Sequence, residues 1–301
     1  MIRFLPMHTS LRLSISLLVF ALVVGALIWR SQPQPPMQDN PSTVAATIFP
    51  LYDITQNIAG DALNVELVLP VGASPHTFEP TPSLLRNLDT ASVVYAIGYE
   101  MDDWAFTVAK SVGADVQIVD AGIAIREGAQ EDEPFDPHYW LSFENAMIIT
   151  QTVADDLSIR FPESADIFQA NAQSYIEELT DAQEQAQDIV SQEVESKNLI
   201  TLHDAWYYFS DSLGLNIIGT FEPSAGREPT PQYLIELTQA LTQTESTALY
   251  SEPQLDTTSL ESFAADNQLT ISILDPLGGD EGATTYIDMM LSNVQIIADN
   301  Q

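Results

Sequence analysis

The sequence predicts an α/β protein of two lobes, each a mainly parallel sheet flanked by helices, joined by one long rigid helix. Two observations support this fold class. Short runs rich in Val, Ile and Leu alternate with helical periods along the chain, which is typical of parallel sheets with covering helices. One segment, 163–194, contains neither Gly nor Pro and interrupts this alternation near the middle of the 301 residues.

The strands expected in the first half lie at 43–49, 64–70, 92–98 and 115–120. Helices are expected at 51–60, from Thr81, at 101–113 and from Ser142 to about residue 159. The second half repeats the order, with strands near 198–202, 215–220, 247–251 and 269–274. Its helices are expected near 204–213, 230–243, 257–267 and 283–298. This matching order predicts two lobes of similar topology.

The long segment has the periodicity of an amphipathic helix, with Pro162 near its first turn. Its apolar positions recur at spacings of four and three: Phe168, Ala172, Tyr175, Leu179, Ala182, Ala186 and Ile189. Because it separates the two α/β halves, we interpret it as a stiff connector, although a core helix of a single domain is the alternative. The expected boundaries are 43–161 for the N-terminal lobe, 162–196 for the connecting helix and 197–301 for the C-terminal lobe.

The first 30 residues are expected to be a signal or membrane anchor, since 13–29 are nearly all apolar. A cleaved signal ending at Ala26 is one interpretation. An uncleaved anchor is favoured because Arg30 and a Pro/Gln-rich tether, 31–42, follow directly. Basic residues before the apolar stretch place the N-terminus in the cytoplasm and the folded part outside.

The chain is strongly acidic, with 9 Lys and Arg against 43 Asp and Glu and a net charge of −34. Such a surface repels nucleic acid and anionic lipid and concentrates cations. Adaptation to a salty medium and adaptation for solubility both explain this charge. The absence of cysteine excludes disulfides, thiolate metal sites and a lipid-modified N-terminal Cys.

Three histidines and one aspartate fall where a strand is followed by a helix: His76, His138, His203 and Asp275. The only other histidine, His8, lies in the N-terminal segment. Ligands of open parallel sheets bind beyond the carboxyl ends of the strands, so a site between the lobes could collect two of these residues from each half. Three imidazoles and one carboxylate suit tetrahedral Zn²⁺. Without sulfur ligands, a copper(I) or iron–sulfur site is disfavoured.

The segments that carry these residues, "SPHTFEPTP", "DPHYWL", "HDAWYYF" and "LDPLGG", resemble the ligand segments of a known family. This family is the metal-binding solute-binding proteins of ABC importers, of the zinc-uptake protein A type. The resemblance covers nearly all of the chain after residue 42 and implies a metal in the cleft between the lobes. It implies His76, His138, His203 and Asp275 as ligands. Zinc-type members have His at the third position and manganese-type members commonly have Glu, so His203 favours Zn²⁺ and leaves Mn²⁺ open.

The resemblance implies an extracytoplasmic protein that captures Zn²⁺ as cargo for a high-affinity ABC importer, as a monomer with a membrane permease as its partner. An enzyme is not expected, since the "HExxH" and "GxSxG" signatures are absent. Two alternatives stay open. If Asp275 does not bind the metal, three histidines plus water would resemble a zinc-dependent hydrolase. A metal-binding adhesion or sequestering protein could also use this fold.

Several acids could orient the metal ligands through hydrogen bonds, although in so acidic a chain each is better explained as a surface charge. The candidates are Glu79, Asp204, Glu222 and Glu252. The loop 126–136 departs from zinc-type relatives, because it carries acids where they often have histidines. It is either a solvated loop or a weak, unselective attractor of cations.

Overall fold

The computed structural model describes residues 41–87, 91–118, 136–222, 229–244, 248–255 and 257–301. The expected membrane segment 13–29, and the acidic loop apart from Asp136, lie outside these residues. No helix in the described ranges has the length and hydropathy needed to cross a membrane.

The N-terminal lobe contains a four-stranded parallel sheet with the strand order β2-β1-β3-β4. Its strands are β1 (Thr43–Ala46), β2 (Asn64–Leu67), β3 (Ala91–Ala96) and β4 (Asp115–Ile118). The helices between them are α2 (Phe49–Ala59), α3 (Pro82–Asn87) and α4 (Trp104–Val112). The strand order reverses between the two central strands, β1 and β3. The connections that follow these two strands therefore leave in opposite directions, an arrangement that places a ligand-binding crevice at the carboxyl ends of the strands.

The C-terminal lobe repeats this topology, with the parallel order β6-β5-β7-β8. Its strands are β5 (Asn198–His203), β6 (Asn216–Glu222), β7 (Ala248–Ser251) and β8 (Thr270–Ile273). Its helices are α8 (Tyr207–Leu213), α9 (Pro231–Thr244), α10 (Thr258–Asn267) and α11 (Tyr286–Asn300). The order reverses between β5 and β7, the equivalents of β1 and β3. The predicted fold class is confirmed.

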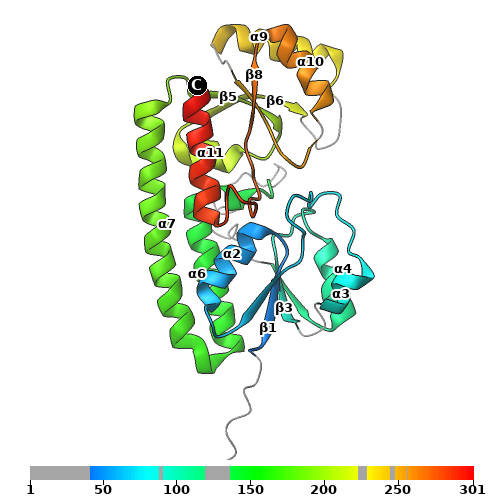
Figure 1. Cartoon of the computed structure of the whole chain (residues 1–301), viewed down its shortest axis with the longest axis vertical. Helices are drawn as coiled ribbons and strands as arrows, with labels where there is room; N and C mark the ends of the chain where they lie inside the picture. The colour runs from blue at the N-terminus through cyan, green and yellow to red at the C-terminus, as the bar shows by residue number, and fades with distance from the viewer. Residues whose placement is uncertain (1–40, 88–90, 119–135, 223–228, 245–247, 256) are drawn as a thin grey trace, which may run out of the picture. The chain divides into compact units, whose positions relative to one another are not determined.

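The lobes are joined by a helical segment: η1 (Tyr139–Leu141), α6 (Phe143–Arg160), η2 (Pro162–Ser164) and α7 (Ala165–Glu193). The Ser142 side chain caps α6 by accepting a hydrogen bond from Asn145 N. Figure 1 shows α7 running beside both lobes, next to α6 and α11. The buried stripe of α7 matches the predicted one except at its end, where Val190 is buried and Ile189 is only partly so.

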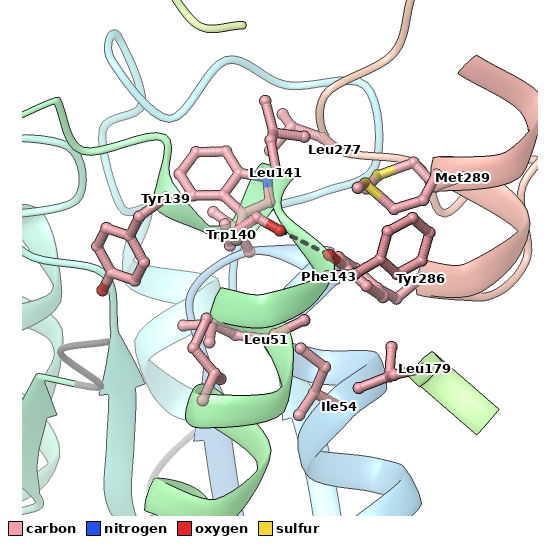
Figure 2. Packing of buried hydrophobic residues seen from close by; sticks show 14 of the residues in the cluster. Leu51, Ile54, Tyr139, Trp140, Leu141, Phe143, Leu179, Leu277, Tyr286 and Met289 are labelled. Carbon is pink, nitrogen blue, oxygen red and sulfur yellow. Dashed lines mark hydrogen bonds between the residues drawn. The ribbon is translucent and has the colours of Figure 1, made fainter. Parts of the chain in front are cut away.

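One continuous hydrophobic core connects the lobes and the long helix. Figure 2 shows part of it, with Leu51, Trp140, Leu179, Tyr286 and Met289 packed together although they come from α2, η1, α7 and α11. Aromatic side chains contribute most to such cores because each buries a large apolar area. The core therefore holds η1, and the histidine directly before it, against both lobes.

Buried hydrogen bonds fix the same junction. Tyr286 OH donates to the Trp140 carbonyl at 2.7 Å, and Trp140 Nε1 donates to the Pro276 carbonyl at 2.8 Å. The carboxylate of Asp53, on α2, accepts from Tyr286 N at 2.9 Å and from Tyr175 OH at 3.2 Å. The first turn of α11 is thus tied to the N-terminal lobe and to α7.

Candidate metal centre

The three predicted histidines come together. His76 lies in the loop between β2 and α3, His138 directly precedes η1, and His203 ends β5. One ligand nitrogen from each lies within 4.8 Å of the other two. Their ring centroids are 4.9 Å apart for His138 and His203, 5.3 Å for His76 and His203, and 5.5 Å for His76 and His138. His138 and His203 are buried, and His76 is exposed.

The cluster surrounds a small cavity of about 20 Å³, the space of roughly one water molecule or one ion. Met101, Trp140, Glu252 and Gln254 also line it. His138 Nε2 is buried there without a hydrogen-bond partner among the described residues. A buried unpaired imidazole nitrogen is unfavourable, and a bound cation would satisfy it.

His203 is oriented by a carboxylate at the end of the neighbouring strand. Its Nδ1 lies 3.0 Å from Glu252 Oε1, and Glu252 directly follows β7. Glu252 Oε1 also accepts from Trp206 Nε1 at 3.1 Å, so the carboxylate is itself fixed. An ionised carboxylate only accepts hydrogen bonds, so the proton belongs on Nδ1 and the lone pair of Nε2 is free for a metal.

His138 is oriented in the same way by Asp136. The carboxylate Oδ1 lies 2.7 Å from His138 Nδ1 and accepts from His138 N at 2.9 Å. Our sequence interpretation missed this residue. The signal was the position of an Asp two residues before the histidine, a spacing at which Asp side chains commonly bond to the backbone. In both buried histidines, Nδ1 therefore faces a carboxylate and Nε2 points away from it.

His76 is positioned through its loop. Trp104, in the first turn of α4, donates from Nε1 to the carbonyl of Pro75 at 3.1 Å. Its ring also packs against Phe78, with centroids 4.8 Å apart. These two contacts hold the loop on both sides of the exposed histidine, and sequence reasoning did not identify Trp104.

The environment gives the histidines different proton affinities. The groups packed around the His76 ring desolvate it and lower its pKa to about 4, although part of the side chain stays exposed, and the charges of His138 and His203 act in the same direction. Burial also disfavours the charged form of His203, but the hydrogen bond and charge of Glu252, with smaller contributions from Asp204 and Asp136, raise its pKa above 6.5. At neutral pH, His76 is therefore neutral, and His203 competes for protons more strongly than His76 does.

Metal binding should weaken as the pH falls through the pKa of His203, because a histidine must lose its proton to become a ligand. His76 adds further competition only near pH 4, where it titrates. Zinc titrations between about pH 8 and about pH 5 would measure this dependence. In Glu252→Gln the charge that raises the pKa is removed, so the midpoint should move to lower pH. A zinc affinity that does not change with pH, in the wild type and in Glu252→Gln alike, would contradict the three-histidine site.

Asp275 is held outside the cluster. It follows β8, and its Oδ1 accepts from Gln254 Nε2 at 2.8 Å and from Leu277 N at 3.0 Å. Within the described parts of the chain, the group of side chains close enough to share one ion contains the three histidines and not Asp275. Its role as a fourth ligand therefore stays a prediction.

The four acids predicted to orient the ligands differ in how they relate to the histidines. Glu252 contacts His203, as described above. Asp204 follows His203, and both burial and the charge of Asp136 raise the pKa of its carboxyl. Glu222 is the register partner of His203 across β5 and β6, and Glu79 is exposed on the His76 loop.

Comparison with known proteins finds relatives that are named for binding or taking up metal ions, in agreement with the histidine cluster. Residues 44–300 match the family model described as "Zinc-uptake complex component A periplasmic". The manganese-binding lipoprotein MntA of Halalkalibacterium halodurans is 30% identical over 250 residues, which is 81% of this chain and 83% of that protein. The manganese ABC transporter substrate-binding lipoprotein PsaA of Streptococcus anginosus is 27% identical over 304 residues, covering 96% and 98%. The crystal structure of ZnuA superposes with a TM-score of 0.76 at 26% identity, covering 86% of this chain and 99% of that one.

Proposed function

This chain belongs to the family of metal-binding substrate-binding proteins of ABC importers, and we propose that its cargo is Zn²⁺, held by His76, His138 and His203. Proteins of this family act outside the cytoplasm with membrane permease and ATPase components, and they are not enzymes. The hydrolase alternative is therefore set aside. The observation that carries the proposal is the convergence of three imidazoles on a cavity the size of one ion.

The ligand chemistry favours zinc over manganese. Zn²⁺ accepts imidazole nitrogen readily in a tetrahedral site, whereas Mn²⁺ prefers more oxygen ligands. His203 supplies nitrogen from a buried position that Glu252 orients. The relatives MntA and PsaA are named for manganese and ZnuA for uptake of zinc, so in this proposal Mn²⁺ is the second cargo.

Asp275 is the fourth ligand in this proposal. Four protein ligands close the tetrahedron and leave no position for a reactive water, as a carrier requires. Because Asp275 lies outside the histidine cluster, binding would draw its carboxylate toward the ion.

The same proposal includes a monomer that delivers the ion to its permease, with residues 13–29 as a retained anchor or a cleaved signal.

A zinc titration tests the function. Trp140 lies 5.3 Å from His138 between ring centroids, and Trp206 contacts Glu252, so tryptophan fluorescence should change and saturate at about one equivalent of Zn²⁺. Elemental analysis should find one zinc per chain. Mg²⁺, which prefers oxygen ligands, serves as the control cation and should cause no change. If zinc causes no spectral change and no metal is found, the proposed function is wrong.

A further inference from the structure

Gln254 contacts both parts of the candidate centre. It lines the cavity together with the three histidines, and its Nε2 donates to Asp275 Oδ1 at 2.8 Å. We infer that Gln254 is a specificity-determining residue that holds the Asp275 carboxylate away from the histidine cluster and thereby disfavours ions that depend on that carboxylate. This inference rests on the proposed function and concerns which ion the site selects.

The restraint on Asp275 has a fixed part and a movable part. Asn293, which is buried on α11, clamps the backbone by accepting from Asp275 N at 2.9 Å and donating to Asp275 O at 2.8 Å. The carboxylate itself accepts from Leu277 N at 3.0 Å and from Gln254. Of these contacts, the one with Gln254 is made by a flexible side chain. It is therefore the contact that can change while the backbone stays in place.

The orientation of the Gln254 amide supports this role. An ionised carboxylate accepts but does not donate, so the NH₂ group of Gln254 must face Asp275. The amide oxygen is consequently directed elsewhere, and it is buried without a hydrogen-bond partner in the described ranges. A buried unpaired oxygen is unfavourable. The Gln254 side chain thus makes the hydrogen bond to Asp275 through Nε2 while its Oε1 stays unpaired.

This arrangement affects two ions differently. Zn²⁺ can take most of its coordination from the three imidazoles and needs Asp275 for one position. Mn²⁺ prefers oxygen ligands and a higher coordination number, so it depends more strongly on the carboxylate. Any ion that recruits Asp275 must first break the contact with Gln254. Zn²⁺ can stay bound to the three imidazoles while this contact is intact, whereas Mn²⁺ cannot, so the contact weakens Mn²⁺ binding more than Zn²⁺ binding. Gln254 would contribute to selectivity without being a ligand itself.

The test compares dissociation constants for Zn²⁺ and Mn²⁺, each titrated alone into the full chain. In Gln254→Ala the ratio Kd(Mn)/Kd(Zn) should fall about tenfold, mainly because Mn²⁺ binds more tightly. Gln254→Asn keeps the amide but shortens it by one methylene, and it should shift the ratio in the same direction. It also provides the measurement if the alanine variant does not fold. The matched control is Gln232→Ala, which removes an exposed 2.9 Å contact with Glu236 on α9 and should leave the ratio unchanged.

A double-mutant cycle identifies the route of the effect. In an Asp275→Asn background, Gln254→Ala should no longer alter the ratio, because the restrained carboxylate is gone. A ratio within about twofold of wild type in both Gln254 variants would overturn the inference. Weaker binding of both metals by a similar factor would also overturn it, since that result indicates a residue that orients Asp275 for binding. A wild-type protein that binds neither metal would instead refute the proposed function.

Discussion

Replacing His203 by alanine should weaken Zn²⁺ binding by at least about a hundredfold, a larger loss than is typical for residues that only support metal ligands. The substitution removes one of three converging nitrogens and the hydrogen-bond partner of a buried carboxylate, Glu252. Competition with a chelator of known affinity would measure the dissociation constant. Circular dichroism of the same samples would show that the fold is retained.

Two further variants make this result specific. His8→Ala removes the histidine that lies in the N-terminal segment, and it should leave zinc affinity unchanged. His203→Glu replaces the nitrogen by oxygen, so it should also weaken Zn²⁺ binding while Mn²⁺ binds better relative to zinc. If His203→Ala bound zinc as tightly as wild type, His203 would not be a ligand.

Asp53→Ala should lower the free energy of unfolding by about 3 kcal/mol, because two buried donors lose their acceptor. These donors are Tyr286 N and Tyr175 OH, which join α11 and α7 to α2. Urea unfolding followed by circular dichroism would measure the change. Asp181→Ala, an exposed site on α7, is the matched control and should change stability by less than about 0.5 kcal/mol. A loss below about 1 kcal/mol for Asp53→Ala would show that these bonds do not hold the junction.

The pH dependence of this junction follows from the same carboxyl. Burial raises the pKa of Asp53, although the hydrogen bonds from Tyr286 and Tyr175 oppose the shift. Because the folded-state pKa lies above the unfolded one, the ionised carboxyl costs stability at neutral pH, and this cost is relieved as the pH falls through the folded-state pKa. Asp53→Asn cannot titrate, so its stability should lack this gain on acidification.

The sequence was sufficient to predict the strands, the long helix and the meeting of the histidines. Parallel strands present their carboxyl ends at one edge, so residues that follow them converge whatever the details of packing. The end of the buried stripe on α7 was placed one residue too early, at Ile189 in place of Val190, because the 3.6-residue period drifts relative to a strict heptad.

The contacts that orient the histidines were harder to predict. Asp136 and Trp104, and Gln254 beside Asp275, act through hydrogen bonds whose partners depend on side-chain conformation, which spacing in the sequence does not specify. Glu252 was one of four candidate acids, and only the pairing of β5 with β7 places it beside His203. Topology thus predicted where the site lies, whereas the shape of its surroundings came from the structure.

X-ray absorption spectroscopy of the protein loaded with one equivalent of Zn²⁺ tests the three-histidine centre most directly. We expect three imidazole nitrogens at about 2.0–2.1 Å and one oxygen ligand at a similar distance. In His203→Ala the imidazole count should fall to two. A wild-type spectrum dominated by oxygen, with one imidazole or none, would contradict a centre formed by His76, His138 and His203.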